Sequence, residues 1–507
     1  MTNANLYALF ENHFPSDLSA TALEVPGGEV VSYGALHDLS ARFAGALDSV
    51  GVVKGERVAV QVDKSPQAVA LYLACLRIGA VYLPLNTAYT PAEVSYFLED
   101  AQPKVLVCRP SSEQSLANVV GENADLHILT MDEYGQGSML TKADTVPPLT
   151  DIIELADDDL AAILYTSGTT GRSKGAMLSH ANLASNAKAL HAMWGWRDGD
   201  VLIHALPIFH VHGLFVAIHC ALLNGSKMWF LPKFDADQVI ELMPKSTVLM
   251  GVPTFYTRLV DHPDLTAETT ANMRLFVAGS APLLAETFTA FEDITGQCIL
   301  ERYGMTETGM ITSNPLDGDR LPSTVGYPLP GIQVRVADED GSILAVNEIG
   351  VLEVSGPNVF SGYWRMPEKT AAEFRSDGWF ITGDVAKMSE DGRVSIVGRA
   401  KDMIISGGYN VYPKEIEAII DALPGIKESA VIGAPHPDFG EAVVAIIIAA
   451  PDASIDKAFI QKGLQDQLAR FKQPKSVFVI DELPRNTMGK VQKNILRETY
   501  KETFKGS

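Results

Sequence analysis

A segment rich in glycine, hydroxyl and basic residues occupies positions 165–175, with the sequence YTSGTTGRSKG. It follows an apolar run at 161–164 that predicts a strand, and a helix is predicted to start near His180. Glycines let a backbone approach phosphate closely, hydroxyl and N–H groups can surround its oxygens, and Lys174 adds positive charge. The segment is not a P-loop, because Gly175 follows Lys174 where that motif needs Ser or Thr. It therefore predicts a phosphate-binding loop, with a plain surface turn as the simpler alternative. The candidate phosphate ligands are Thr166, Ser167, Gly168, Thr169, Thr170, Gly171 and Lys174.

Five further blocks accompany this loop, and together they resemble the adenylate-forming enzymes: acyl- and aryl-CoA synthetases, nonribosomal adenylation domains and luciferases. They follow that family's order along nearly the whole chain, which makes the resemblance far more specific than any single block. The blocks are 279–282 (GSAP), 303–308 (YGMTET), 378–384 (GWFITGD), 398–402 (GRAKD) and 484–490 (PRNTMGK).

The resemblance implies a nucleotide site assembled from several of these blocks. It makes Tyr303 the flat platform for adenine and Asp384 the acceptor of both ribose hydroxyls, with Arg399 as the cationic partner. A carboxylate suits a vicinal diol because it accepts two hydrogen bonds at once, although Asp is also a common turn former. Backbone groups near the base edge would come from Gly279, Ser280 and Ala281.

Thr306 and Glu307 follow the platform residue closely in the sequence. By resemblance, the Thr306 hydroxyl contacts phosphate and Glu307 is a ligand of Mg²⁺, an ion that prefers oxygen donors such as carboxylates. An ordinary helix N-terminus is the alternative interpretation of the Thr-Glu pair.

Lys490 ends the 484–490 block. Most lysines are solvated surface residues, but the resemblance implies that this one swings into the cleft and neutralises charge while the acid attacks the α-phosphate. Positioning and positive charge carry most of the rate of such transfers. Acylation would remove the charge, so a lysine acylase and deacylase are expected partners of Lys490. The nearby Lys493 is interpreted as a solvated surface residue.

The resemblance gives a second group of residues roles in the step that forms the thioester. The resemblance makes Lys401 a hinge, about which a smaller C-terminal part rotates between adenylation and thioester formation. Ser406, Gly407 and Gly408 resemble the segment that faces the CoA thiol in the second orientation, with a simple turn as the alternative.

The segment 207–213 (PIFHVHG) matches the family's acyl-pocket segment. His210 aligns with the histidine that lines the carboxylate site, whereas His212 is interpreted as structural, and a metal role for the pair lacks a third ligand. Arg302 precedes the adenine platform and is expected near the acyl end, with Met305 also in contact with the substrate. A buried guanidinium needs a partner; a second substrate carboxylate would bind it through both oxygens, and an internal ion pair is the alternative.

The order of apolar segments predicts an α/β fold that positions these residues. Short β-branched runs such as 58–62 and 104–107 alternate with helical stretches such as 65–76, which predicts parallel sheets with helices on both faces. From about 326 to 398, alternating runs between Gly, Asp, Asn and Pro predict a small antiparallel, barrel-like β unit. A boundary near Lys401 divides a body, 1–400, which binds ATP and the carboxylate, from a mobile α+β cap, 401–507, which carries the catalytic lysine.

Composition limits the partners. With 62 acidic and 40 basic side chains the net charge is −22, which argues against nucleic-acid or anionic-membrane surfaces. The longest purely apolar run, 442–450, is too short to span a bilayer, and the first residues lack a signal-peptide pattern. Four separated cysteines exclude a disulfide scaffold and indicate a reduced, cytoplasmic protein.

The sequence thus predicts a ligase that forms malonyl-CoA, AMP and pyrophosphate from malonate, CoA and ATP through a malonyl-adenylate, with Mg²⁺. Within the family, the string ERYGMTE at 301–307 resembles the malonyl-CoA synthetases, and the relative preference for methylmalonate stays open. One alternative is the same chemistry on a short, medium-chain or aryl acid. A rival from another class is a phosphotransferase or ATPase that releases ADP or orthophosphate.

Overall fold

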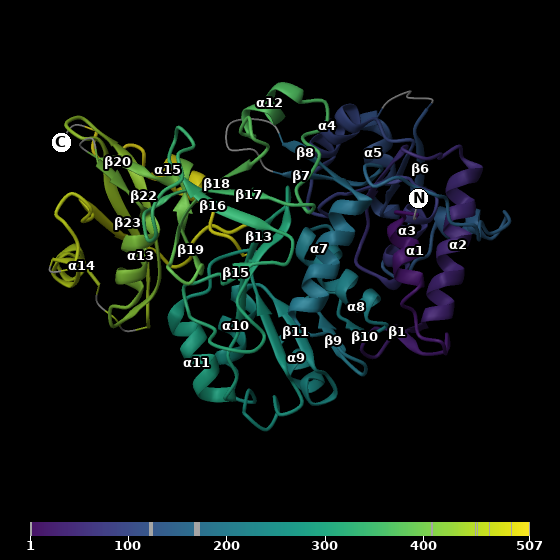
Figure 1. Cartoon of the computed structure of the whole chain (residues 1–507), viewed down its shortest axis with the longest axis horizontal. Coiled ribbons are helices and arrows are strands. Elements are labelled where there is room, and N and C mark those ends of the chain that lie inside the picture. The colour runs from purple at the N-terminus through teal and green to yellow at the C-terminus, as the bar shows by residue number, and fades with distance from the viewer. Residues whose placement is uncertain are drawn as a thin grey trace.

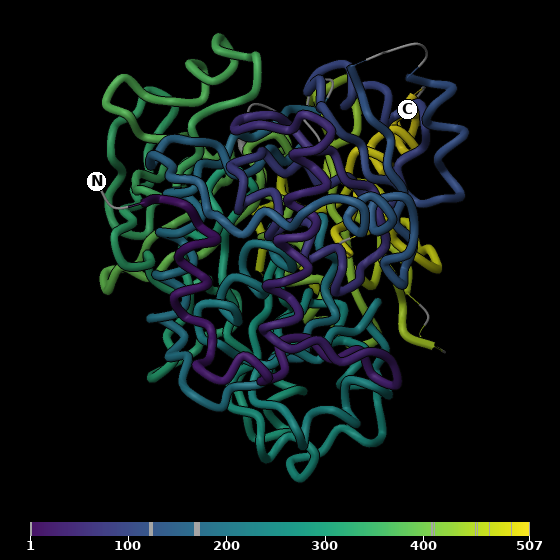
Figure 2. Tube along the Cα trace, turned by 90° about the vertical axis from the view of Figure 1, so that its right-hand side faces the viewer, coloured from purple at the N-terminus to yellow at the C-terminus, as the bar shows by residue number. Residues whose placement is uncertain are grey.

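The apolar runs form four sheets in the computed structural model, which describes residues 3–120, 125–166, 173–406, 409–451, 453, 455–465, 467–487 and 489–505. Figure 1 shows a six-stranded sheet in the right-hand half of the molecule and the cap at the left, with a small β unit between the cap and the body. Seen from the right-hand side in Figure 2, the purple and blue N-terminal segments lie in front of the yellow C-terminal ones. In the described parts, no helix combines the length and apolar character that crossing a bilayer requires.

The six-stranded sheet is parallel apart from its last strand. Its order is β6 (His127–Thr130), β5 (Val105–Cys108), β3 (Arg57–Gln61), β4 (Val81–Pro84), β7 (Leu160–Thr166) and β8 (Lys174–Ser179), with β8 antiparallel to β7. The helix after β3, α3 (Pro66–Arg77), starts at the N-cap Ser65 with proline in its first turn, the two signals expected of a helix start. The other helices of this part are α1 (Leu6–Glu11), α2 (Tyr33–Ser49), α4 (Pro91–Ala101), α5 (Glu113–Val120) and α6 (Ser138–Ala143).

A nine-stranded sheet forms the rest of the body. Its order is β15 (Tyr327–Pro328), β14 (Gly309–Ser313), β13 (Leu300–Met305), β12 (Leu275–Ala278), β11 (Val248–Gly251), β9 (Val201–His204), β10 (Lys227–Phe230), β1 (Thr21–Glu24) and β2 (Val30–Ser32). The strands from β13 to β1 are parallel, and both edges are antiparallel. Its helices are α7 (His180–Met193), the π-helix η2 (His212–Ile218), α8 (His219–Leu223), α9 (Ala236–Leu242), α10 (Pro253–Val260) and α11 (Ala285–Thr295). The predicted α/β fold is confirmed, with antiparallel edges added to the parallel sheets.

The helix predicted after the glycine-rich segment is preceded by a strand that the sequence analysis missed. Strand β8 runs antiparallel to β7, with Thr166 opposite Lys174, and Ser179 then caps α7. Six residues that include Gly175 and Ala176 are too short and too weakly apolar for their alternation to be distinguished from a loop.

The β unit and the cap contain the two remaining sheets. The β unit is antiparallel, in the order β16 (Gln333–Ala337), β17 (Gly350–Ser355), β18 (Phe380–Met388) and β19 (Val394–Arg399), with α12 (Pro367–Ala372) beside it. The cap has the order β21 (Tyr409–Val411), β20 (Ile404–Ser406), β23 (Gly440–Ala449) and β22 (Ile426–His436), and β24 (Ser476–Val479) also pairs with β23. Its helices are α13 (Pro413–Asp421), α14 (Lys457–Leu464) and α15 (Lys493–Tyr500).

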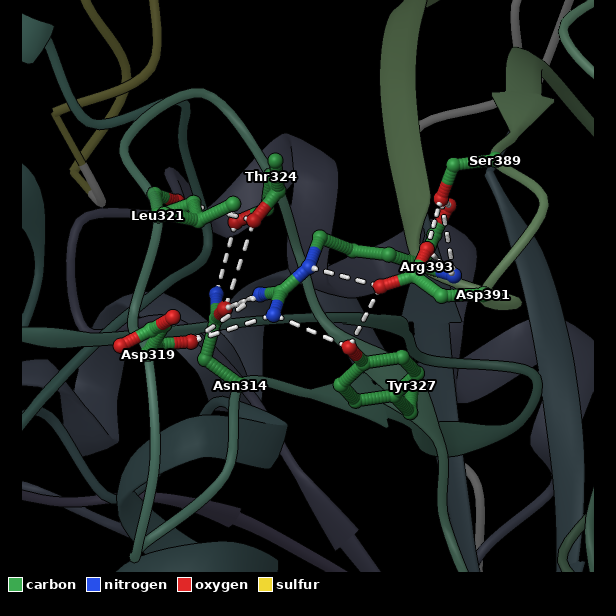
Figure 3. Close-up of polar contacts among 8 residues, drawn as sticks. All are labelled: Asn314, Asp319, Leu321, Thr324, Tyr327, Ser389, Asp391 and Arg393. Atoms are coloured by element: carbon green, nitrogen blue, oxygen red, sulfur yellow. Dashed lines mark hydrogen bonds and ion pairs between the residues drawn. The ribbon is translucent and has the colours of Figure 1, made fainter.

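Arg393, in the turn between β18 and β19, fastens the β unit to the nine-stranded sheet (Figure 3). Its Nη1 donates to Asn314 Oδ1 at 2.8 Å, and its Nη2 donates to the Tyr327 hydroxyl at 3.0 Å. Asn314 in turn donates from Nδ2 to the carbonyl of Glu301 at 3.0 Å. This cluster therefore fixes the β18–β19 hairpin relative to β13, the strand that carries Arg302.

Candidate active site

Arg302 on β13 is a buried cation without an acceptor. Its residue surface is 3% exposed, and Nε and Nη2 of the guanidinium lack a hydrogen-bond partner among the described residues. Burial lowers the pKa of Arg302 to about 9, so the group is still charged at neutral pH. The guanidinium lies on the backbone of Gly279, where a Cβ would stand 2.5 Å from Arg302 Cζ. A glycine is required at position 279 to make room for the guanidinium. The sequence had instead suggested that the Gly279 backbone contacts the edge of the adenine base.

Glu301, the neighbour of Arg302, points away from it, as adjacent residues on a strand do. Its Oε1 accepts a hydrogen bond from Leu283 N at 3.1 Å, while Oε2 has no partner in the described chain. Burial raises the pKa of Glu301 to about 7. No Glu301–Arg302 ion pair forms within the described residues, so the internal pair considered as the alternative is absent there.

Two histidines lie beside Arg302. His210 was expected here, but His212 was interpreted as structural, and the structure brings its ring to the same place: it is 1% exposed, with Nδ1 3.3 Å from Ser280 Oγ. Nε2 of His212 has no partner among the residues described. Burial, assisted by the Arg302 charge, lowers the pKa of His210 to about 4 and that of His212 well below its usual range. Ser280 has a φ of +74°, a strained conformation that is frequent at functional sites.

The residues expected at adenine and ribose are brought together from two sheets. Asp384 and Arg399 face each other across the β18–β19 hairpin, and Arg399 Nε lies 2.7 Å from Asp384 Oδ1. The hydroxyl of Tyr303, from β13, donates to Asp384 Oδ2 at 2.5 Å. The carboxylate is thus held between a phenol and a guanidinium at the junction of the nine-stranded sheet and the β unit.

Thr306 and Glu307 form the turn between β13 and β14, so the helix N-terminus considered for them is wrong. Glu307 is 5% exposed, and its Oε1 accepts from the Tyr363 hydroxyl at 2.9 Å. That hydroxyl also lies 2.6 Å from Glu373 Oε2, and Glu373 Oε1 binds Lys174 Nζ at 3.0 Å. Tyr363 and Glu373 were not predicted as site residues, because they follow no local pattern and only the fold brings them to Lys174 and Glu307.

Lys490 belongs to the cap and lies near enough to Arg399 and Asp384 to be affected by their charges. It is an exposed residue, yet desolvation near the protein surface, aided by the Arg399 charge, lowers the pKa of Lys490 to about 8. Its loop contacts the body: Asn86 Nδ2 donates to Thr487 Oγ1 at 3.3 Å, and a Cβ at Gly489 would lie 3.0 Å from Thr254. The cap therefore places its lysine beside the body's charged residues.

The remaining predicted residues have varied positions. Lys401 lies in the 3-10 turn η4 (Ala400–Asp402), and Ser406 is buried at the end of β20. Lys493 was expected to be solvated and is instead a largely buried ion-pair partner of Glu417, with Nζ 2.5 Å from Oε1. Thr166 ends β7, Met305 ends β13, and Ala281 follows the strained Ser280. Ser167, Gly168, Thr169, Thr170, Gly171, Gly407 and Gly408 lie outside the described residues.

Comparison with known proteins defines the class. The AMP-binding enzyme model matches residues 10–364, and the AMP-binding enzyme C-terminal domain matches residues 415–490. The chain belongs to the AMP-binding enzyme family, and the resemblance seen in the sequence is confirmed.

Individual relatives are similar over nearly their full lengths. The crystal structure of ATP-bound MatB from Rhodopseudomonas palustris is 55% identical and has a TM-score of 0.97, with 99% of this chain and 100% of that chain covered. The apo MatB structure, at the same identity and coverage, has a TM-score of 0.86, so this chain matches the arrangement of the ATP-bound form more closely. The mitochondrial malonate–CoA ligase of Mus musculus is 36% identical over 89% of this chain and 83% of its own length. A feruloyl-CoA synthase from Amycolatopsis is 34% identical over 94% and 95%.

Proposed function

We propose that this protein is a malonate–CoA ligase, which joins malonate to CoA with conversion of ATP to AMP and pyrophosphate. The observation that carries the proposal is the buried Arg302 guanidinium, whose Nε and Nη2 lack acceptors among the described residues. A buried charge is costly unless it is paired. The distal carboxylate of malonate would accept from both nitrogens in the bidentate geometry that arginine favours. An apolar fatty or aryl tail in the same place would leave the cation unpaired, which argues against the feruloyl-type substrate.

The positions of the cations suit a short dicarboxylate. Burial lowers the pKa of His210, and the charges of Arg302 and Lys490 lower it further, so both cations lie near one imidazole. In malonate a single CH₂ group separates the two carboxylates. One carboxylate would contact Arg302 while the other, next to His210, attacks the α-phosphate beside Lys490.

In the first half-reaction the chain's own residues orient the nucleotide and supply charge. Asp384 binds the ribose hydroxyls, Tyr303 contacts the adenine, and Lys490 stabilises the negative charge that develops on the α-phosphate. Lys174 and Thr306 contact the outer phosphates together with the glycine-rich segment 166–171.

The protein also fits a magnesium ion. No cluster of three metal-ligating side chains occurs among the described residues, but Mg²⁺ typically binds substrate phosphates and only one or two carboxylates. Glu307 is a buried carboxylate at the phosphate end of the site, and the Tyr363 hydroxyl orients it. When bound, Mg²⁺ neutralises phosphate charge and helps pyrophosphate to leave.

In the second half-reaction the cap rotates about Lys401 and presents the segment 406–408 to CoA. The CoA thiol attacks the carbonyl carbon of malonyl-adenylate, the C–O bond to AMP breaks, and malonyl-CoA is released. The similarity to MatB and to the mouse malonate–CoA ligase supports this assignment.

A product assay with five acids tests the proposal. Wild-type protein with ATP, Mg²⁺ and CoA should release AMP and pyrophosphate with malonate, and much less with acetate, octanoate or benzoate; methylmalonate measures the tolerance for a branch. Release of ADP or orthophosphate would contradict the adenylate-forming chemistry. Equal rates with malonate and acetate would contradict the role of the distal carboxylate.

We propose that acylation of Lys490 inhibits this reaction. The lysine is exposed, and its positive charge is needed in the first half-reaction. Mass spectrometry should find the acyl group on Lys490 after treatment with a lysine acylase, together with loss of adenylation. Deacylation should restore the activity; unchanged activity of fully acylated protein would contradict this mechanism.

A further inference from the structure

Lys64, just after β3, is a partly buried lysine to which the proposed reaction gives no task. Its Nζ lies 2.8 Å from His204 Nδ1, 2.8 Å from the His204 carbonyl oxygen and 4.4 Å from the centre of the Phe230 ring. Among the described residues no carboxylate forms an ion pair with it. Desolvation lowers the pKa of Lys64 well below its usual range. A lysine kept in such a place without a counter-ion needs an explanation in its contacts.

Those contacts define the protonation of His204. Its Nε2 lies 2.9 Å from the carbonyl oxygen of Gly213, which can only accept, so Nε2 carries a proton. His204 is 1% exposed, and burial together with the Lys64 charge lowers the pKa of His204 well below its usual range, so the ring is neutral. Nδ1 is therefore an acceptor, and Lys64 is its donor. Both hydrogen bonds require the same tautomer.

His204 and Gly213 lie at the two ends of the segment that carries the site histidines. His204 ends β9, and Gly213 lies in the first turn of the π-helix, so their contact closes the loop 205–212. Gly213 packs so closely on this loop that a Cβ there would lie 2.1 Å from Pro207 O. π-helical turns are weakly stable and are often found at functional sites.

Packing alone does not fix this loop. A cavity of about 110 Å³ lies behind it, lined in part by Lys64, Thr87, Pro207, Ile208 and Phe209. Because one side of 207–209 faces a hollow, the polar contacts through His204 carry more of the positional constraint than they would in a filled core.

We propose that Lys64 is a positioning residue for the carboxylate site, which fixes His204 in its Nε2–H tautomer and thereby holds His210 and His212 in place. The inference rests on the proposed malonate-activating function, since those histidines border the expected substrate. Lys64 touches none of the reacting groups and acts through His204.

The test compares Lys64→Met with the same substitution of Lys227 on β10, the strand that pairs with the His204 strand β9. Lys227 on β10 also lies over an aromatic ring, 3.6 Å from the centre of Trp229, but it pairs with Glu24 and not with a histidine. Lys64→Met should lower kcat for malonate-dependent pyrophosphate release by ~10–100-fold, the cost of a small misplacement. Its KM for ATP should stay within about twofold of wild type, and Lys227→Met should leave kcat within the same range. Lys64→Arg keeps a cationic donor and should retain most of the activity.

Two further measurements separate positioning from general damage. In the His204→Leu background, Lys64→Met should change kcat by less than about twofold, because the His204 ring through which Lys64 acts is already absent. In ¹⁵N NMR spectra, His204 of the wild type should show the Nε2–H tautomer, and Lys64→Met should give a mixture. Three results would each overturn the proposal. The first is a double variant whose loss of kcat equals the product of the two single losses; the second is an Nδ1–H signature of His204 in the wild type; the third is a wild-type kcat for Lys64→Met. If wild-type protein releases no pyrophosphate with malonate, the proposed function fails, while the NMR result still decides the tautomer.

Discussion

Replacing Arg302 by Met should abolish malonate activation and at the same time stabilise the protein. Methionine fills a similar volume without charge. The guanidinium is 3% exposed with two nitrogens unpartnered among the described residues, so in the free protein it is a desolvated charge with incomplete compensation. Its removal should raise the free energy of unfolding by ~1–3 kcal/mol, as replacement of a buried polar group by a well-packed apolar one can do.

The functional loss follows from the same two nitrogens. Truncating one partner of a buried, hydrogen-bonded charge pair costs ~2–5 kcal/mol, which corresponds to a ~30- to ~4000-fold lower kcat/KM for malonate. Acetate, which has no distal carboxylate, should lose no activity and should gain relative to malonate. The assay is pyrophosphate release with both acids, together with urea unfolding at neutral pH.

The substitution Gly279→Ala tests the role of the Arg302 guanidinium in a second way, by displacing it and not removing it. A Cβ at that position would lie 2.5 Å from Arg302 Cζ, so the guanidinium must move although its charge remains. Malonate activity should fall as it does in Arg302→Met, but without the gain in stability. A kcat/KM for malonate within twofold of wild type in both variants would refute the reasoning, and so would an equal loss with acetate.

Three other predictions follow from the charges at the site. Lys490→Ala should eliminate malonyl-adenylate formation but leave thioester formation from supplied malonyl-adenylate nearly intact, with Lys505→Ala, at a well-exposed lysine of the cap, as the control; equal loss of both half-reactions would make Lys490 structural. Because Lys490 must be charged and its pKa is about 8, kcat/KM should fall as the pH rises through about 8, and Lys490→Arg should move this loss toward the pKa of about 9 of Arg302; an unmoved limb would exclude Lys490 as its source. Glu301 has a folded pKa of about 7 against an ordinary 4.5, so the wild type loses stability as the pH rises from 4.5 through 7. Glu301→Gln should therefore be stabilised by up to ~3 kcal/mol at pH 8 and by almost nothing at pH 4.5, measured by urea unfolding; equal shifts at both pH values would contradict the raised pKa.

The elements of the fold were predictable wherever the sequence pattern is local. Strand β3 and helix α3 lie within about a residue of the predicted ranges 58–62 and 65–76. The start of α3 is marked by the N-cap Ser65 and by a proline in its first turn. Strand β8 was not predictable, because its pairing with β7 across the glycine-rich segment decides its conformation. Antiparallel edges such as β13–β14 likewise depend on partners that are distant in space and not on the pattern of one strand.

The candidate site was predictable only as a set of separate residues. Arg302 could be singled out because a charge beside the predicted adenine platform is chemically unusual. The close packing that makes Gly279 necessary is a contact between β13 and the residue after β12, which are distant in the sequence. His212 is the first residue of the π-helix and is buried, whereas His210 precedes it and is partly exposed, a difference that the sequence pattern does not show. Neither fact has a signature in residue type or spacing.

Two of the four expected site cations turn out to be neutralised locally. Lys174 pairs with Glu373 and Arg399 pairs with Asp384, and both carboxylates belong to the β unit and its flanking segment. In the proposed nucleotide site, these pairs would orient side chains without creating a strong positive field. A net charge of −22 is thus compatible with ATP binding, because the ion delivered with the nucleotide supplies positive charge at the phosphates.

The other two cations, Arg302 and Lys490, form no ion pair with a carboxylate in the described parts of the chain, and both lower the pKa of His210 between them. Each lies where the proposed reaction has a negative charge that no metal covers: the distal carboxylate of malonate at Arg302, and the α-phosphate at Lys490. Arg302 is a fixed residue of the body, whereas Lys490 arrives with the cap. In the proposed reaction, discrimination among acids therefore rests on Arg302 of the body, and the charge for the chemical step comes from Lys490 of the cap.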